Sequence, residues 1–310
     1  MSTYRSEGGQ PLLTVAMPVF NGGRFLRLAL LSSIHQSFSD WELILIDDGS
    51  NDHAVEGVAD IVDPRIRIIR DGENKGLAAR LNEAIDLASG KYFARMDQDD
   101  ISHPERFSKQ LALLQGDQSL DLVGAKCVTI SENNHIVGFL PGPVTHKEIC
   151  LKPWLGFYLP HPTWLGRTAW FRQYRYMLPG PYCCEDQELL LRTHQCSRFH
   201  VLPEYLLAYR LRDRFDFAKA WRTRKTLFGI QSRYFRNKKE YWSAGLAQVG
   251  FCLRLAKDIW TLIIQSSTVL LGKTSRRVVI SDPNTEEWCE IIEKFDFVEN
   301  DNSICGGKVA

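Results

Sequence analysis

Over the first hundred residues, short apolar runs alternate with segments whose apolar residues recur at helical spacing. The runs are residues 12–20, 41–47, 65–70 and 91–96, and the helical segments are 24–36, 53–62 and 76–90. Strands that alternate with helices of about 10–15 residues are typical of βαβ units. The sequence therefore predicts an α/β fold, a Rossmann-like and mostly parallel sheet with helices on both faces.

Polar residues follow three of these runs. Asn21 comes after the first, Asp47 and Asp48 end the second, and the triplet Asp97, Asp99 and Asp100 follows the fourth. In parallel sheets, ligands bind outside the carboxyl ends of the strands, so we expect one shared site. Carboxylates this close repel one another unless they hold a cation, and Mg²⁺ takes one or two of them together with substrate phosphates.

The chain lacks the glycine-rich devices that cradle phosphates. No G-x-G-x-x-G follows the first run, and no G-x-x-x-x-G-K-[ST] occurs. A bound nucleotide would then need a metal to neutralise its phosphates. Asp48 could accept a hydrogen bond from a base N–H, although "DDGSND" also suits a turn and a helix N-cap.

Three longer stretches carry a resemblance to a known family. They are "VAMPVFNGGRFLRLALLSSIHQSFSDWELILIDDGSND", "ENKGLAARLNEAIDLASGKYFARMDQDDISHPERF" and "EDQELLLR". In order and spacing they resemble the motifs of the family 2 glycosyltransferases, which have the GT-A fold, over residues 12–212. The resemblance implies inverting transfer of a sugar from a nucleotide-diphosphate donor, with UDP as the expected carrier. It also implies a divalent cation, Mn²⁺ or Mg²⁺, and as acceptor a hydroxyl of a glycan or a lipid-linked molecule in surface polysaccharide or glycolipid synthesis.

The same resemblance assigns roles to individual residues. Asp186 matches the general base, with Glu185 and Glu188 as alternatives. Asp97 and Asp99 match the D-x-D metal motif, and Asp99 is the first choice for direct ligand. The residues expected to bind the nucleotide donor are Pro18, Phe20, Asn21, Asp48, Lys75, Arg80 and Asp97.

Two further features concern the acceptor and the metal. The candidates for acceptor contact are Trp154, His161, Trp164 and Glu185, although aromatic residues of this kind also occur simply as core. Members of the family often carry a histidine shortly after the "YR" near the end of the domain, and some use it on the metal. Here Arg212 stands near that place, and an arginine could pair with a diphosphate but could not ligate the ion.

Charge is distributed unevenly along a chain whose formal net charge is only +1. Residues 210–277 contain 16 Lys and Arg against 4 Asp and Glu, interleaved with aromatic residues at helical spacing. The uncharged stretch from Ile259 to Gly272 is shorter than the ~20 residues that a bilayer span needs. We therefore expect a basic helical extension that contacts a membrane surface, or alternatively a solvated hairpin packed on the main domain.

The expected organisation is a tail (1–11), a GT-A domain (12–214), the basic extension (215–280) and an acidic tail (281–310). The acidic tail is expected to fold back on the basic extension or to be mobile. The polar N-terminus shows no signal peptide and the eight cysteines form no CxxC pair, so a cytoplasmic protein, peripheral on the inner membrane face, is expected.

Two other functions stay open at this stage. A sugar-nucleotide nucleotidyltransferase also places metal-binding carboxylates on an α/β sheet, but it needs a glycine-rich, basic loop that "MPVFNGGRF" matches poorly. A catalytically inactive glycan- or nucleotide-binding scaffold of the same fold is the second alternative. Neither a nucleic acid partner nor an oligomeric state is indicated.

Overall fold

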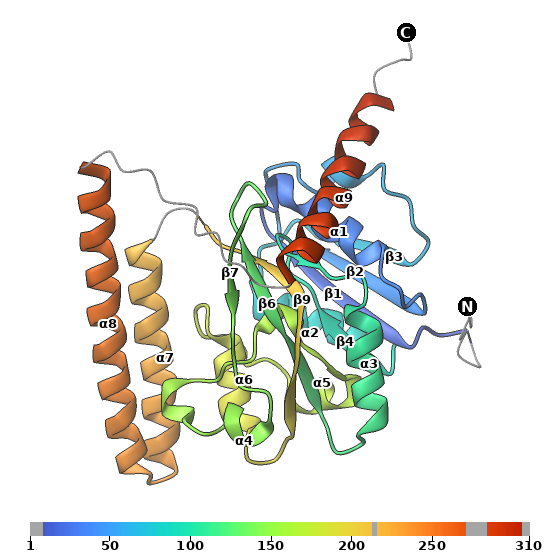
Figure 1. The fold of residues 1–310 in the computed structure, drawn as a ribbon. Helices are drawn as coiled ribbons and strands as arrows, with labels where there is room; N and C mark the ends of the chain where they lie inside the picture. The colour runs from blue at the N-terminus through green and yellow to red at the C-terminus, as the bar shows by residue number, and fades with distance from the viewer. Residues whose placement is uncertain (1–8, 213–215, 271–283, 306–310) are drawn as a thin grey trace.

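The structure is a computed structural model that describes residues 9–212, 216–270 and 284–305 (Figure 1). In these residues the strands are β1 Leu13–Val19, β2 Trp41–Asp47, β3 Ile66–Arg70, β4 Tyr92–Arg95, β5 Ile101–Ser102, β6 Leu122–Ile130, β7 Ile136–Leu140, β8 Leu165–Arg167 and β9 Phe199–Arg210. The helices are α1 Leu26–Ile34, α2 Leu77–Leu87, α3 Arg106–Gly116, α4 His146–Ile149, α5 Thr168–Tyr174, α6 Glu185–Thr193, α7 Phe217–Asn237, α8 Tyr241–Leu270 and α9 Asn284–Cys305.

The strands form one sheet in the order β3-β2-β1-β4-β8-β6-β9-β5, with β7 paired to β6. The pairs β2–β3, β1–β2 and β1–β4 are parallel, as the alternating pattern predicts. Beyond β4 the sheet is mixed, because β8 runs antiparallel to both β4 and β6 while β6 and β9 are parallel. The predicted α/β class is confirmed, and the carboxyl ends of β1, β2 and β4 lie at one edge of the sheet.

Helices cover both faces of this sheet, also as predicted. Alternate side chains of β1 and β2 point to opposite faces, as the period-2 geometry of a strand requires. Val15 and Leu43 pack in a core cluster that includes residues of α1 and α3. Ala16 and Ile44 pack in a second cluster, formed with residues of α2, α5 and α6.

Two expected elements differ in the structure. Residues 53–62 form only the short 3₁₀ turn η2 Glu56–Val58, because Ala54, Val55 and Val58 are held in the core by packing rather than by a continuous helix. The stretch that suggested two closing strands is the single strand β9. Its register against β6 shifts between Ala125 and Cys127, and this irregularity accommodates Pro203.

The predicted C-terminal helical extension is present as the antiparallel pair α7 and α8 (Figure 1). Phe251 of α8 contacts Phe228 and Trp221 of α7, and Arg224 pairs with Asp258 at 3.1 Å. No helix among the described residues is both long and apolar enough to cross a membrane. The expected domain boundaries at 214 and 280, and residues 1–8 of the N-terminal tail, lie outside the described residues.

The acidic tail does not fold back on the basic extension within the described residues. Helix α9 packs instead against α1 and β9, with Trp288 and Phe295 fully buried. The indole N–H of Trp288 donates a hydrogen bond to the carbonyl oxygen of Tyr205 at 3.2 Å, and His103 Nε2 lies 3.0 Å from Glu287 Oε1. Burial of an aromatic face thus outweighs the attraction between unlike charges that suggested the other position.

Gly90 provides a test of the close approach between the backbone that leads into β4 and the backbone of β1. Helix α2 ends three residues earlier, at Leu87, and a Cβ on Gly90 would lie 2.6 Å from the backbone nitrogen of Thr14. We expect Gly90→Ala to lower the free energy of unfolding by about 1–3 kcal/mol, because a strand backbone cannot easily move away. Gly116→Ala is the matched control, since its added Cβ meets nothing within 4 Å. Equal stability of the two variants in urea titrations would contradict this packing.

Candidate active site

A cleft of about 1190 Å³ runs along the edge of the sheet where β1, β2 and β4 end. Asp48, Asp97, Asp99 and Asp186 all line it, although they are widely separated in the sequence. The other predicted site residues that line it are Pro18, Phe20, Lys75, His161 and Glu185, together with Arg212. The structure therefore brings the predicted acids into one place.

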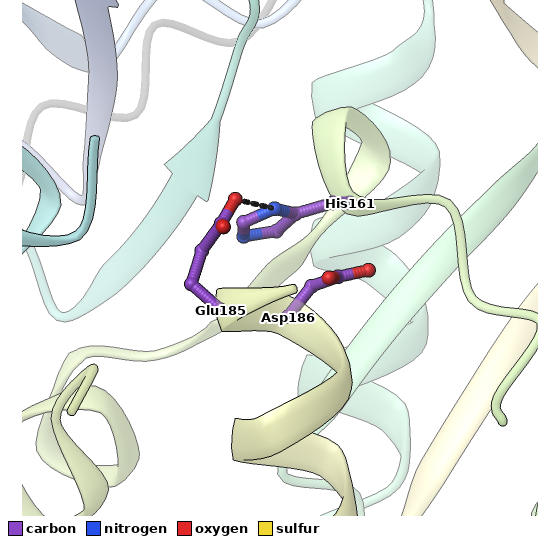
Figure 2. Close-up of side chains that lie close together, drawn as sticks. All are labelled: His161, Glu185 and Asp186. Carbon is purple, nitrogen blue, oxygen red and sulfur yellow. Dashed lines mark ion pairs between the residues drawn. The ribbon is translucent and has the colours of Figure 1, made fainter. Parts of the chain in front are cut away.

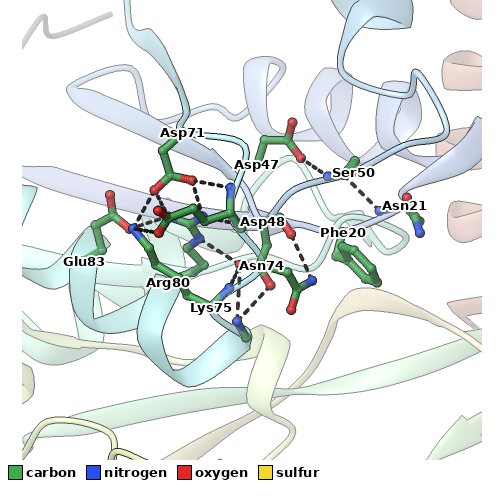
Figure 3. Close-up of polar contacts among 12 residues, drawn as sticks. Phe20, Asn21, Asp47, Asp48, Ser50, Asp71, Asn74, Lys75, Arg80 and Glu83 are labelled. Carbon is green, nitrogen blue, oxygen red and sulfur yellow. Dashed lines mark hydrogen bonds and ion pairs between the residues drawn. The ribbon is translucent and has the colours of Figure 1, made fainter.

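Asp48 is buried at the end of β2 and its carboxylate is held from three sides (Figure 3). Oδ1 accepts hydrogen bonds from the backbone N–H of Lys75 at 2.7 Å and from Arg80 Nε at 2.9 Å. The N–H of Gly76 donates to Oδ2 at 3.0 Å. The loop before α2 thus fixes the direction in which this carboxylate faces the cleft.

Arg80 and Lys75 both pair with Asp71 and thereby hold this loop. Arg80 is fully buried and does not line the cleft, so a direct donor contact is not consistent with its position. Its guanidinium pairs with Asp48, Asp71 and Glu83, and these partners raise its pKa (Figure 3). The Lys75 ammonium lines the cleft but pairs with Asp71 at 2.6 Å.

The loop after β1 carries Phe20, which is 48% exposed and lines the cleft. Gln98, between the two acids of the D-x-D motif, clamps this loop: its Oε1 accepts from Phe20 N at 2.7 Å and its Nε2 donates to Phe20 O at 3.0 Å. Asn21 has a left-handed backbone (φ 50°) and accepts a hydrogen bond from the N–H of Asn51. Asn21 therefore shapes the loop and is not among the residues that line the cleft.

The D-x-D acids lie after β4 beside two arginines. Asp97 pairs with the buried Arg95 at 2.5 Å, and Asp99 pairs with the exposed Arg212 at 3.2 Å. Burial raises the pKa of Asp97, and the Arg95 charge opposes that shift. Burial and the charges of Asp97 and Asp99 raise the pKa of Asp100 well above its usual range.

His161, Glu185 and Asp186 meet at the start of α6 (Figure 2). His161 Nδ1 lies 3.6 Å from Glu185 Oε1, and His161 Nε2 lies 2.8 Å from the Tyr176 hydroxyl. Burial raises the pKa of Glu185 to about 7, and the Asp186 charge adds to the shift. Burial also raises the pKa of Asp186, whose Oδ2 accepts a hydrogen bond from Gln187 Nε2 at 3.0 Å. Burial lowers the pKa of His161 well below its ordinary value, so the imidazole is neutral.

Three other candidates lie away from the cleft. Glu188 is buried and paired with Arg192 at 2.9 Å, which leaves it unsuited as a base. Trp164 is fully buried and its indole N–H donates to the carbonyl oxygen of Leu159, so it cannot stack on an acceptor sugar. Trp154 packs against the second core cluster and does not line the cleft.

The sequence analysis missed three residues that organise the site: Arg95, Gln98 and Tyr176. Arg95 carried a signal, because it is a charged residue inside the otherwise apolar run that forms β4. The side-chain clamp of Gln98 and the hydroxyl of Tyr176 on His161 depend on tertiary contacts between residues 15 or more positions apart. No local pattern in the sequence indicates them.

Comparison with known proteins defines the family. The model of glycosyl transferase family 2 matches residues 14–175, more than half of the chain, so the chain belongs to this family, as its motifs predicted. The bifunctional glycosyltransferase pgtA of Dictyostelium discoideum is 37% identical over 42% of this chain, which spans 19% of that relative's length. An Escherichia coli protein, UDP-Glc:alpha-D-GlcNAc-diphosphoundecaprenol beta-1,3-glucosyltransferase WfgD, is 30% identical over 44% of this chain and 54% of its own length.

Solved structures show the same fold. Staphylococcus aureus TarS 1–349 in complex with UDP-GlcNAc superposes with a TM-score of 0.59 at 18% identity, covering 91% of this chain and 80% of that one. The mannosyltransferase PcManGT from Pyrobaculum calidifontis, in complex with GDP-Man and Mn²⁺, gives a TM-score of 0.56 at 13% identity over 94% and 86% of the two chains. The predicted GT-A fold is thereby confirmed.

Because Arg80 and Asp48 form a buried ion pair, we expect a substitution of Arg80 to reduce the stability of the fold strongly. We expect Arg80→Met to lower the free energy of unfolding by about 3 kcal/mol, because it leaves the buried Asp48 carboxylate without its cation. Lys75→Met is the control, since its ammonium is exposed and its ion pairs are screened by solvent. Denaturant titration of both variants checks this; a loss in Lys75→Met as large as in Arg80→Met would be the contrary result.

The raised pKa of Glu185 predicts a pH-dependent stability difference. A carboxyl whose folded pKa is about 7, against an ordinary value of 4.5, stabilises the fold below pH 4.5 and loses that contribution as pH rises through 7. Glu185→Gln should therefore be more stable than wild type at pH 8, by up to about 3 kcal/mol, and match it near pH 4.5. The charged and titratable groups around Glu185 that stay in both proteins are Asp186, Arg95, Asp97 and His161. Thermal melts across this range, with exposed Glu290→Gln as control, measure the difference; a pH-independent difference would argue against a raised pKa.

Proposed function

We propose that the protein is an inverting, metal-dependent glycosyltransferase that moves a sugar from a nucleotide-diphosphate donor, a UDP-sugar, to a hydroxyl group of an acceptor. The observation that carries the proposal is the convergence of Asp48, Asp97, Asp99 and Asp186 on one cleft. Membership of glycosyl transferase family 2 supports the reaction class.

The donor nucleotide is assigned to the part of the cleft between Asp48 and Phe20. Asp48 Oδ1 is already engaged by three donors, whereas Oδ2 accepts only the N–H of Gly76 among the described contacts and retains a lone pair for a base N–H. Phe20 presents an exposed ring that a planar base can stack against. UDP is preferred because the TarS complex contains UDP-GlcNAc, although that likeness extends to the fold alone.

A divalent cation fits the acids after β4. Asp97 and Asp99 offer only oxygen ligands, which Mg²⁺ and Mn²⁺ prefer. Asp100 Oδ2 is buried and has no hydrogen-bond partner among the described residues, so this acidic cluster contains a polar atom that the protein leaves unsatisfied. Asp97 and Asp99 would hold the ion, which when bound neutralises the negative charge that grows on the leaving diphosphate. Arg212 lines the cleft and is assigned to the same diphosphate.

Asp186 is proposed as the general base. Its Oδ2 is held by Gln187, which leaves Oδ1 to take the proton of the acceptor hydroxyl as that hydroxyl attacks the anomeric carbon. Burial raises the pKa of Asp186, which makes its carboxylate a stronger base than an exposed one. His161 and Glu185 line the cleft next to Asp186 and are assigned to the acceptor side.

The acceptor is proposed to be a glycan or lipid-linked sugar of surface polysaccharide or glycolipid synthesis. The support is the name of the Escherichia coli relative, which acts on a sugar linked to diphosphoundecaprenol. The cleft has the size for a donor and a sugar acceptor together, since ligand pockets of about 300–1,000 Å³ hold drug-sized molecules.

Substitution of Asp186 tests the assignment. We expect Asp186→Asn to bind donor as tightly as wild type but to lose at least about a hundredfold in transfer rate, because an amide cannot accept the proton. Release of nucleoside diphosphate and mass of the glycosylated product are measured with a panel of UDP-, GDP- and dTDP-sugars, with Mn²⁺ or Mg²⁺ and with a chelator. Asp117→Asn, an exposed acid on the far end of α3, is the control and should keep full activity.

The remaining outcomes separate the alternatives. Full transfer by Asp186→Asn would remove Asp186 from the base role and leave Glu185. Release of inorganic pyrophosphate from a nucleoside triphosphate and a sugar phosphate would point to a nucleotidyltransferase. Donor binding without any turnover, with every donor and a membrane lipid extract as acceptor, would point to an inactive scaffold.

A further inference from the structure

Helix α8 exposes a continuous apolar stripe. Its residues are spaced by seven and four positions, which places them on one side of an α-helix. They are Trp242, Val249, Leu253, Trp260 and Ile264. Trp242 is 81% exposed, Leu253 65% and Trp260 64%. At 1.5 Å per residue the stripe is about 33 Å long.

The opposite side of α8 is occupied by the rest of the protein. Ala247, Gly250 and Asp258 are buried, and Phe251 packs against α7. Arg254 donates a hydrogen bond to the carbonyl oxygen of Leu155 in the 3₁₀ turn η3 Pro153–Leu155. The stripe is therefore the outer face of the helix, and no described residue covers it.

Helix α7, antiparallel beside it, exposes a basic stripe. Arg222, Lys225, Arg233 and Arg236 are exposed and fall on one side of the helix. No acidic residue occurs within α7. A hairpin that exposes an apolar face with tryptophan near both ends, and also a row of cations, has the two features that bind proteins to membrane surfaces, burial in the acyl boundary and attraction to anionic headgroups.

We propose that the α7–α8 hairpin is a docking surface for a bilayer that contains anionic lipids, with the α8 stripe in the headgroup–acyl boundary and the α7 cations on the headgroups. A second copy of the chain is the less favourable occupant. Symmetric contact through α8 would pair one apolar stripe with another and offer the α7 cations no anionic partner, because α7 contains no acidic residue.

The position of the hairpin gives this surface a use, and this step rests on the proposed function. Lys219 and Thr223 of α7 line the cleft, and the exposed Arg222 lies between them in sequence. Arg222 is therefore within one helical turn of residues that line the cleft, and a membrane that contacts Arg222 lies near the cleft. A lipid-linked acceptor could then present its sugar to Asp186 without leaving the bilayer.

Vesicle co-sedimentation of the full chain tests the surface. The vesicles are phosphatidylcholine alone, or phosphatidylcholine and phosphatidylglycerol in a three-to-one ratio. We expect binding to the anionic vesicles that weakens as salt is raised. The double substitution Leu253→Glu with Trp260→Glu should weaken this binding by about tenfold or more, because two charges enter the buried face. Val62→Glu, at a highly exposed apolar position of the main domain, is the control and should bind like wild type.

A second set of variants separates the basic stripe from general charge. Changing Arg222, Lys225, Arg233 and Arg236 together to Gln should remove the preference for anionic vesicles. The matched control changes Arg67, Lys91, Lys147 and Arg198, exposed cations of the main domain, and should retain the preference. Brominated lipids quench the fluorescence of tryptophans that enter the bilayer, so quenching reports burial of the stripe directly. We expect less quenching in the double variant Trp242→Phe with Trp260→Phe. Far-UV circular dichroism confirms that each variant is folded.

The outcomes are separate from those of the transfer assay. Anionic-vesicle binding that is lost in the α8 variant, while donor hydrolysis in solution is kept, supports the surface. Vesicle binding by a protein without transfer activity would refute the proposed function and leave the surface intact. No binding to anionic vesicles, equal binding by all variants, or a wild-type dimer in light scattering that becomes a monomer with Trp260→Glu, would each overturn the proposal.

Discussion

The cleft depends on one buried cation, the guanidinium of Arg95 in the middle of the sheet. It pairs with Asp97 at 2.5 Å, and the negative charges of Asp97, Glu185 and Asp186 favour its charged form. Burying several neighbouring carboxylates away from water costs free energy unless a positive charge lies close to them. A charged residue inside an apolar strand is unfavourable for the strand itself, so its position is explained by the acids it compensates. The D-x-D motif and the start of α6 can lie on one cleft because Arg95 lies between them.

Fixed polar contacts also hold the donor side of the cleft in place. Asp48 faces the cleft in a fixed direction because Arg80 and two backbone N–H groups hold it. The loop after β1 is held to the D-x-D loop by Gln98. These contacts are present without any ligand, so the donor side is largely preorganised and little conformational entropy needs to be lost when a donor binds.

Local sequence pattern predicted the α/β class, the strands that end at the cleft and the acids at those strand ends, because strand alternation and acidic strand ends are local signals. Asp186 came instead from the resemblance to the family 2 glycosyltransferases. Predictions from local pattern were wrong where contacts between distant parts of the chain determine the structure. Residues 53–62 have helical spacing but form only a short turn, and α9 is held by the buried Trp288 rather than by charge. Trp164 was a candidate as an aromatic residue and Arg80 through the family resemblance, yet both are fully buried, and neither residue type nor motif position reveals the burial of a single side chain.

The order of the site residues along the chain has a further consequence. Apart from Arg212, the groups assigned to the donor, from Pro18 to Asp99, precede residue 100, whereas His161, Glu185 and Asp186 follow residue 160. The β6–β7 hairpin lies between the two sets. On the proposed roles, the choice of sugar and the choice of acceptor are encoded in separate halves of the gene. Recombination within the hairpin could therefore pair the sugar of one relative with the acceptor of another, which gives this family a simple genetic route to new polysaccharide structures.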